Sequence, residues 1–523
     1  MAKPLTSRIE HVVVLMLENR SFDNVLGGLY PDLTRKGLYR GLTGVETNPI
    51  DPANRSAGSV TVFQGPAASS IWIMPYPDPG ELYSDMVQQI FGSNASVLPS
   101  GVLPPMSGFA WNYKRQPPAP PGDGWPKTWP VPVNIMQYYS ASAMPVTTSL
   151  ALQYAVCDCW FAAAPVQTLA NRILTHCGTP SRIPGTNNSR INNPDYTDRL
   201  LPDLTPPVTD TTIFELLDDA YPEGRAPECS DFDNPTVHLN WKVYYHDAPV
   251  SALCKYVWDR WCLDYLFGGN VFHFQEDFSS ETNFEYDIRS GLLPKYSFIE
   301  PRYTDFFGGV VNSNHPGGAG VDPDNWNGDS LPPPINVMDG ERFLCEVYSI
   351  LQKYPDVFDK TLLIVTYDEH GGLFDHVPPP RAVSPFIPAV NNFNYDREGV
   401  RVPAILINPS IKPQTVYPQR TKPEPVPQPA FDHTSILSTL AAQFGLSGSL
   451  SRRVDLAPQL KGLIPETPVP YQRPPIVCPP PAAAPPPRPG PSVVAIPKGT
   501  HTLAGALGPL YRRIQASKLK TGR

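Results

Sequence analysis

The feature that most constrains the fold of this chain is an uninterrupted run of six apolar residues at positions 12–17, followed at once by Glu18 and Asn19. Such a run is typical of a strand buried on both faces, as in a parallel sheet covered by helices. In these sheets, ligands bind just beyond the carboxyl ends of the strands. Glu18 and Asn19 stand at that point, and both offer oxygen atoms, the ligands that a hard cation prefers.

A second stretch repeats this pattern. Residues 361–367 are mainly apolar or β-branched and lead into Asp368 and Glu369. Elsewhere, strand-like runs alternate with helix-like segments, which predicts an α/β sandwich with a mostly parallel sheet. The chain has 67 prolines and only 17% charged residues, so we expect long ordered loops around the edge of the sheet where these carboxylates gather.

Composition and charge argue against some classes of protein. The net charge is −8 and the basic residues are scattered, so nothing predicts binding to nucleic acid. No apolar run is long enough to cross a membrane, and the N-terminus has no signal-peptide core. We therefore expect a cytoplasmic protein by default, or one exported by a route that the sequence does not show.

The C-terminal region differs in composition from the rest. We expect one domain over residues 1–460 and a Pro-rich extension and tail over residues 461–523. Pro and Ala dominate residues 465–491, which favours extended polyproline conformation over a packed core. This stretch is predicted to be a surface linker, with partner binding as the alternative. Residues 503–519 form a short basic amphipathic segment, either a terminal helix or a point of peripheral membrane contact.

The cysteines match no zinc-binding pattern, because the closest pair has one residue between its members rather than two. We expect ordinary core thiols, or one or two disulfides if the protein is exported. The eight positions are Cys157, Cys159, Cys177, Cys229, Cys254, Cys262, Cys345 and Cys478.

Two further side chains complete a predicted reaction site. Thr168 is expected at the N-cap of a helix, whose free N–H groups and dipole favour a phosphate. A cation held by carboxylates lowers the pKa of a bound hydroxyl, so Thr168 can act as a nucleophile. His433 can protonate the leaving oxygen. Each has a structural alternative, Thr168 as a simple N-cap and His433 as a cap of the helix that follows it.

Four segments together resemble the signature blocks of the phosphoesterase family, in the family's order. They are residues 18–23, 168–172, 368–372 and 432–435. That family contains the phosphocholine-specific and plant non-specific phospholipases C and the respiratory-burst-inhibiting acid phosphatases. The resemblance implies an alkaline-phosphatase-like three-layer α/β sandwich with a mostly parallel central sheet.

The resemblance also implies a metal centre. Its ligands would be Glu18, Asn19, Asp368 and Glu369, with Thr168 as the nucleophile that also touches the metal. The cofactor implied is one divalent ion, Ca²⁺ by the family's usage and by the all-oxygen ligand set, with other divalent ions left open.

Other residues take roles by the same resemblance. Asn171 would help to hold the phosphate, and His433 would lie near the leaving group. His315 resembles a family His-Pro element, and His376 a structural or substrate-contacting one. One departure stands out, because many relatives carry a His where this chain has Glu81. It would alter phosphate contacts, leaving-group chemistry or the pH optimum.

These inferences predict a metal-dependent phosphoric-ester hydrolase. We expect a phospholipase C that cleaves a glycerophospholipid to diacylglycerol and a phosphorylated head group through a phospho-threonine intermediate. The enzymatic alternative is an acid-type phosphomonoesterase acting on small phosphate esters. A third alternative is a non-catalytic secreted binding protein on the same fold. The sequence leaves head-group preference and oligomeric state open.

Overall fold

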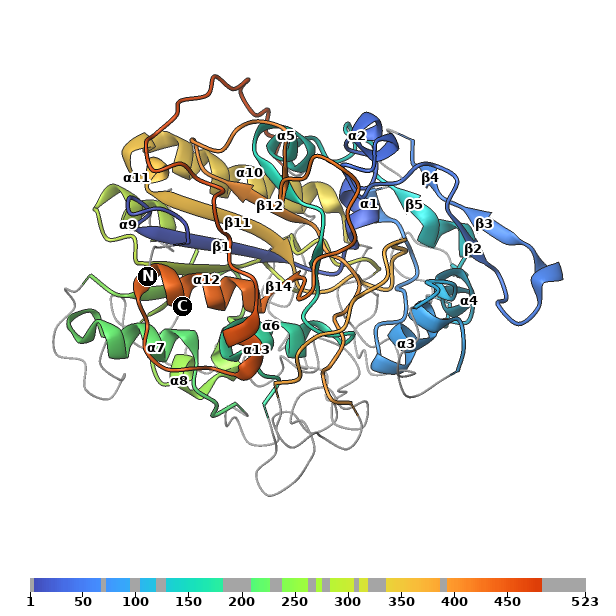
Figure 1. The fold of residues 1–523 in the computed structure, drawn as a ribbon, viewed down its shortest axis with the longest axis horizontal. Coiled ribbons are helices and arrows are strands. Elements are labelled where there is room, and N and C mark those ends of the chain that lie inside the picture. Colours follow the sequence, from blue (N-terminus) through green and yellow to red (C-terminus); the bar gives the residue numbers. More distant parts are fainter. Residues whose placement is uncertain are drawn as a thin grey trace, which may run out of the picture.

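An eight-stranded sheet runs through the centre of the molecule (Figure 1). The structure, a computed structural model, describes residues 4–66, 72–94, 104–118, 128–181, 208–225, 238–261, 270–274, 283–304, 310–317, 335–385 and 393–481. The strand order is β13-β6-β12-β11-β1-β10-β8-β9. In chain order the strands are β1 (His11–Leu17), β6 (Ala155–Cys157), β8 (Trp241–Tyr245), β9 (Val271–His273), β10 (Tyr296–Glu300), β11 (Thr361–Tyr367), β12 (Ala404–Ile407) and β13 (Thr415–Tyr417).

The two strands predicted from their apolar runs lie side by side in the middle of this sheet. β1 pairs in parallel with β11 on one side and with β10 on the other, so that Val12 lies opposite both Leu362 and Tyr296. Within the described sheet, β12 alone runs antiparallel to its neighbours. The prediction of an α/β fold with a mostly parallel sheet is therefore confirmed.

Helices cover both faces of the sheet and make the three layers (Figure 1). One layer contains α5 (Pro145–Gln153), α9 (Asn283–Arg289), α10 (Val337–Lys353) and α11 (Pro355–Asp359). The other contains α6 (Thr168–Cys177), α7 (Ile213–Ala220), α8 (Lys255–Trp258), α12 (Thr434–Phe444) and α13 (Arg452–Leu456). Both faces of β1 and β11 are buried beneath these layers, which explains why their sequences do not alternate.

A peripheral lobe extends from the carboxyl end of β1, on the right of Figure 1, and has a small apolar core of its own. The composition predicted long ordered loops at this edge of the sheet, and the structure places short helices and strands there as well. The lobe contains α1 (Phe22–Leu26), α2 (Pro31–Arg35), the hairpin of β2 (Thr47–Pro49) and β3 (Ser59–Thr61), β4 (Phe63–Gln64), α3 (Tyr83–Phe91), α4 (Phe109–Lys114) and β5 (Gln137–Tyr138). A further two-stranded pair joins β7 (Trp160–Phe161) to β14 (Phe431–Asp432).

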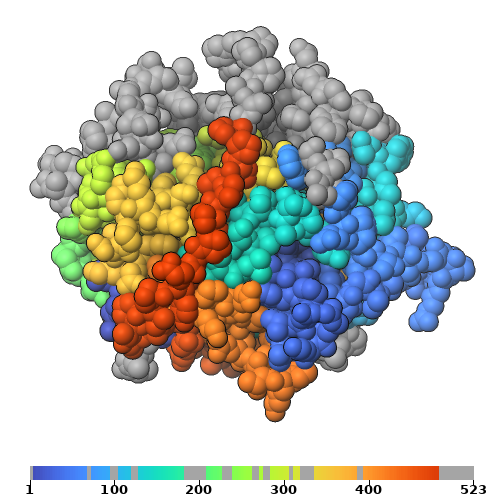
Figure 2. Space-filling model, turned by 90° about the horizontal axis from the view of Figure 1, so that it is seen from above, coloured from blue at the N-terminus to red at the C-terminus, as the bar shows by residue number. Residues whose placement is uncertain are grey.

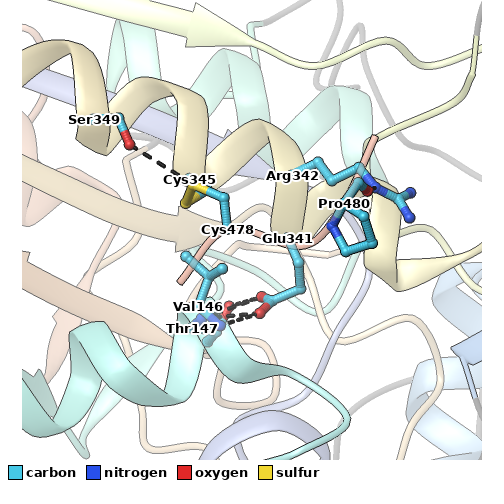
Figure 3. The surroundings of a disulfide bond; sticks show 8 residues. All are labelled: Val146, Thr147, Glu341, Arg342, Cys345, Ser349, Cys478 and Pro480. Carbon is cyan, nitrogen blue, oxygen red and sulfur yellow. Dashed lines mark hydrogen bonds between the residues drawn. A yellow bond between two sulfur atoms is a disulfide. The ribbon is translucent and has the colours of Figure 1, made fainter. Parts of the chain in front are cut away.

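Cys345 and Cys478 form a disulfide between α10 and the C-terminal segment (Figure 3). Cys157, Cys159, Cys177 and Cys254 are buried free thiols, as expected for core cysteines. Cys229 and Cys262 lie outside the described residues, as do the tail segment 503–519 and the end of the Pro-rich stretch beyond residue 481. Among the helices that the structure describes, none has the length and apolar character of a membrane span.

Candidate active site

The predicted ligands at the ends of β1 and β11 meet at one edge of the sheet. The Asp368 carboxylate accepts hydrogen bonds at Oδ1 from the backbone N–H of Asn19 (3.1 Å) and of Glu369 (2.7 Å). This contact follows from the register, in which Leu17 lies opposite Tyr367, so that the two strands end together. The placement of Asn19 beside Asp368 agrees with the expectation from the two strand ends.

Two glycines after β11 let the backbone close tightly over this edge. Gly371 has a φ of +62°, and a Cβ atom there would lie 2.3 Å from the backbone oxygen of Asn19. Gly372 has a φ of +66°, and its Cβ would lie 2.7 Å from the side chain of Pro79. A side chain at either position would push the Asp368 turn away from β1 or from the peripheral lobe.

The Asn19 side chain lies between Thr168 and Glu81. Its Nδ2 donates to Glu81 Oε1 (2.6 Å), and its Oδ1 accepts from the Thr168 hydroxyl (3.2 Å). Thr168 is the first residue of α6, and Gln167 is the N-cap. The predicted N-cap position of Thr168 is therefore wrong by one residue. In the structure its hydroxyl bonds to Asn19 at the edge of the sheet.

The side chain of Asn171 holds the turn that leads into Thr168. Its Nδ2 donates to the carbonyl oxygens of Val166 (2.6 Å) and Ala164 (3.3 Å), and its Oδ1 accepts from the Ala164 N–H (3.0 Å). The amide is thus engaged with backbone, and its contact with a phosphate stays a prediction. The turn that it fixes sets the position of the Thr168 hydroxyl.

Arg172 is a member of the site to which the sequence reasoning gave no role. Its buried guanidinium donates from Nε to Asp368 Oδ2 (3.0 Å) and from Nη2 to the carbonyl oxygens of Met16 (3.2 Å) and Leu17 (3.1 Å). It therefore ties α6 to the end of β1 and to Asp368. A signal was present, because an arginine one helical turn after Thr168 lies on the same face of the helix.

His433 packs behind the Asp368 turn. The Trp160 indole N–H donates to His433 Nδ1 (3.3 Å), which leaves the ring proton on Nε2 to bond the Asp368 carbonyl oxygen (2.7 Å). Burial lowers the pKa of His433, so the ring is neutral. Both ring nitrogens contact protein groups, and the predicted role near the leaving group stays a prediction.

His315 and Glu81 lie together on the other side of Asn19. His315 Nε2 is 3.4 Å from Glu81 Oε1, and its Nδ1 is 3.9 Å from Asp78 Oδ1. Burial alone would lower the pKa of His315, but the carboxylates of Glu81 and Asp78 outweigh it and raise that pKa well above its usual value. Asp78, to which the sequence analysis gave no role, thus lies beside His315 and Glu81, which were both predicted site residues.

His376 belongs to a separate ionic cluster. Its Nδ1 lies 2.7 Å from Asp23 Oδ2, and Arg401 bridges Asp23 (3.0 Å) and Asp375 (2.9 Å). This cluster joins the turn after β1 to the segment after β11. Arg401 supplies one positive charge to the two carboxylates, and Asp23 raises the pKa of His376 against the lowering effect of burial. Contact between His376 and a substrate stays a prediction.

Comparison with known proteins places the chain in a family. The Phosphoesterase family model matches residues 9–225 and 236–447. The chain belongs to the Phosphoesterase family. It is therefore a phosphoric-ester hydrolase, as the sequence predicted.

Several relatives of this phosphoesterase are named phospholipases C. Non-specific phospholipase C3 of Arabidopsis thaliana is 30% identical over 474 residues, which cover 88% of this chain and 74% of the relative. Non-specific phospholipase C1 of the same plant is 31% identical, with 86% and 69% covered. Phospholipase C A of Mycobacterium tuberculosis is 26% identical, with 84% and 73% covered.

Among solved structures, a protein in the alkaline phosphatase superfamily from Vibrio parahaemolyticus is similar with a TM-score of 0.29 and 11% identity. The match covers 60% of this chain and 64% of that one. A TM-score this low does not support an assignment of fold. The α/β fold of this phosphoesterase is assigned from its own sheet and two helical layers.

The donor set of this phosphoesterase suits a divalent cation. Glu18 is fully buried, and neither of its carboxylate oxygens has a hydrogen-bond partner among the described residues. Oε1 of the buried Glu369 likewise has no such partner among them. The positive charges of His315 and Arg172 and the nearby Ser313 hydroxyl favour the charged form of Glu18. Burial raises the pKa of Glu18 to about 8. Buried carboxylates without partners are costly unless a cation compensates them.

One of two compact groups of potential metal ligands in the described part of the chain lies next to this set, because Glu81 contacts Asn19. Among the described residues, three ligand atoms within 4.8 Å of one another occur in Asp78, Glu81 and His315, and in Asp23, Asp375 and His376. The structure therefore holds acidic and His groups fit for a metal, and the predicted ligand set of Glu18, Asn19, Asp368 and Glu369 stays a prediction.

Proposed function

We propose that this phosphoesterase is a phospholipase C. It would cleave a glycerophospholipid to diacylglycerol and a phosphorylated head group, with Thr168 as the nucleophile. The observation that carries the proposal is the Thr168 hydroxyl, held by Asn19 Oδ1 at the sheet edge beside buried carboxylates. The relatives that align with most of this chain are named phospholipases C. Their names support a glycerophospholipid substrate rather than a phosphomonoester.

The reaction that follows has two displacements at phosphorus. The Thr168 hydroxyl gives up its proton to solvent, and Oγ1 forms a bond to phosphorus while the bond from phosphorus to the glycerol oxygen breaks. Diacylglycerol leaves with a proton from solvent. Water then attacks the phospho-threonine ester, releases the phosphorylated head group and restores the hydroxyl. A divalent ion bound to Glu18, Asn19, Asp368 and Glu369, Ca²⁺ in our proposal, would neutralise phosphate charge and lower the pKa of the hydroxyl.

The protein contributes position and charge. The side chain of Gln167 does not cap α6, so it leaves the N–H groups of the first helical turn to phosphate oxygens. Arg172 holds the Asp368 carboxylate, and Asn171 holds the turn before Thr168. Thr168 is thus held at the start of α6. Asn171 fixes the turn before it, and Arg172 ties the helix to Asp368.

Replacing the nucleophile tests the proposal. Thr168→Ala should lower kcat by at least about 10³-fold, because no other hydroxyl takes its place. The matched control is Thr175→Ala, which removes a buried threonine from the same helix. Its hydroxyl donates to the Asn171 carbonyl oxygen (2.9 Å). The control should retain activity at a temperature where both variants are folded. Turnover by Thr168→Ala at the wild-type rate would refute the nucleophile.

The substrate class is tested with two chromogenic esters, with and without chelator. Turnover of p-nitrophenyl-phosphorylcholine, with diacylglycerol release from phosphatidylcholine vesicles, supports the phospholipase C. Turnover of p-nitrophenyl phosphate alone would instead identify a phosphomonoesterase. Hydrolysis of neither ester after addition of Ca²⁺ would favour a binding protein. Chelator should abolish activity, and added divalent ion should restore it.

A further inference from the structure

Glu81 reaches the reaction site from the peripheral lobe. Its Oε1 accepts a hydrogen bond from Asn19 Nδ2 at 2.6 Å, and the other end of the same amide accepts from Thr168 at 3.2 Å. The three side chains therefore form one chain of hydrogen bonds that ends on the proposed nucleophile.

The chemistry of these groups fixes the direction of this chain. A carboxylate only accepts hydrogen bonds, so Glu81 can face the NH₂ end of the Asn19 amide but not its oxygen. The amide oxygen is then turned toward Thr168, where it receives the hydroxyl hydrogen. Without Glu81, the Asn19 amide can turn over, because the terminal torsion of asparagine is soft and roughly two-fold. Either its oxygen or its NH₂ group can then face Thr168.

The protein holds Glu81 in place independently of a substrate. Gln89 Nε2 donates to the carbonyl oxygen of Gly80 (2.7 Å), and Gln89 Oε1 accepts from His370 Nε2 (2.8 Å). His315 Nε2 lies 3.4 Å from Oε1, the same Glu81 oxygen that Asn19 contacts. The Glu81 side chain is 15% exposed and so lies within the site rather than on the surface.

From this geometry we propose that Glu81 is a positioning residue, which orients the Asn19 amide so that its oxygen holds the Thr168 hydroxyl for attack. The proposal rests on the proposed role of Thr168 as nucleophile. It gives a specific function to the residue at which this chain departs from its resemblance to the family.

Two variants at position 81 separate the hydrogen bond from the charge. Glu81→Ala removes the acceptor and should lower kcat roughly 10- to 100-fold, because misplacement of a reacting group costs this much. KM should change less than about twofold, since the three carboxylates proposed to hold the ion that binds the phosphate are unchanged. Glu81→Gln keeps a carbonyl oxygen as acceptor, and kcat should stay within about fivefold of wild type because only the charge assistance is lost.

The matched control is Asp85→Ala. Asp85 lies one turn further along, accepts from the Leu82 N–H (3.2 Å) and Asn112 Nδ2 (2.8 Å), and does not contact Asn19. If Glu81→Ala acted by loosening this turn, Asp85→Ala would lower kcat as well; we expect it to leave kcat unchanged.

Three results would overturn the proposal. Wild-type kcat in Glu81→Ala, in an enzyme that Thr168→Ala inactivates, would refute the positioning role alone. Equal losses of kcat in Glu81→Gln and Glu81→Ala would show that the charge, not the acceptor, matters. Loss of one bound metal equivalent in both Glu81 variants, measured on purified protein, would make Glu81 a metal ligand instead. Activity retained by Thr168→Ala would contradict the proposed function itself.

Discussion

Asp368 is the residue on which the contacts of the site converge. Its Oδ1 accepts two backbone N–H groups, and its Oδ2 pairs with Arg172 where both side chains are fully buried. Asp368→Asn leaves a buried guanidinium without its counter-charge, which costs about 3–5 kcal/mol. It also removes one proposed metal ligand. We therefore expect a lower Tm and less bound divalent ion per chain, measured by elemental analysis.

A second buried aspartate provides the control for this variant. Asp158 is fully buried and pairs with Arg40 (3.0 Å) and Arg420. Asp158→Asn should lose stability to a similar extent, but it should keep its metal. Equal metal content in the two variants would contradict the assignment of Asp368 as a ligand.

The residues that the sequence placed correctly are those that follow a strand directly. Asn19 and Asp368 come immediately after buried apolar runs, so strand pairing alone brings them together. Glu81 comes to Asn19 through a turn of the peripheral lobe, 62 positions away, and the sequence pattern does not specify that approach. Thr168 was misplaced by one residue, since an N-cap is defined by backbone dihedrals rather than by residue type.

At the scale of elements, Glu341 joins two helices (Figure 3). α5 begins at Pro145 without a side-chain cap of its own. Glu341 of α10 supplies one, because its carboxylate accepts from the N–H groups of Val146 (2.5 Å) and Thr147 (3.1 Å) and from the Thr147 hydroxyl. Although these bonds favour the charged form, burial raises the pKa of Glu341 from 4.5 to about 7.

This raised pKa predicts how stability depends on pH. A carboxyl group with a raised folded-state pKa stabilises the fold fully below its unfolded pKa, and that contribution is lost as pH rises through the folded pKa. Between about pH 4.5 and 7 the loss is on the order of 3 kcal/mol. Glu341→Gln removes the titration, so the advantage of wild type over the variant in unfolding free energy should shrink from pH 5 to pH 8. Parallel curves from denaturant unfolding would contradict this.

The direction of individual strands was harder to predict than their existence. Residues 402–407 form an apolar run, and a strand does occur at Ala404–Ile407. It runs antiparallel between β11 and β6, however. A buried strand has the same apolar pattern in either direction, and only the path of the connecting chain decides which one forms.

At the scale of the whole molecule, the C-terminal segment lies across the body as a strap (Figure 2), which we define as residues 465–481. Arg473 donates to the carbonyl oxygens of Gln153 (3.0 Å) and Pro409 (2.9 Å), and Arg342 donates to that of Pro480. The composition predicted an extended surface segment, and the described part has neither helix nor strand. Its attachment was not predictable, because spacing does not specify which cysteines pair.

The strap should stabilise the fold through its disulfide. Cys345 and Cys478 are 133 positions apart, and closing so long a loop in the unfolded chain is worth about 4–5 kcal/mol in the chain-entropy account. The double variant Cys345→Ala/Cys478→Ala should therefore unfold at a lower temperature than wild type. Dithiothreitol should lower the Tm of wild type to a similar degree and leave that of the double variant unchanged, since the remaining described cysteines are free thiols. Both Cys residues lie on or against α10, away from Asn19 and Thr168 in the sequence and in their contacts, so kcat at a temperature well below the Tm should not change. A Tm equal to that of wild type in the double variant would mean that the contacts of Arg473 and Arg342 hold the strap without the covalent bond.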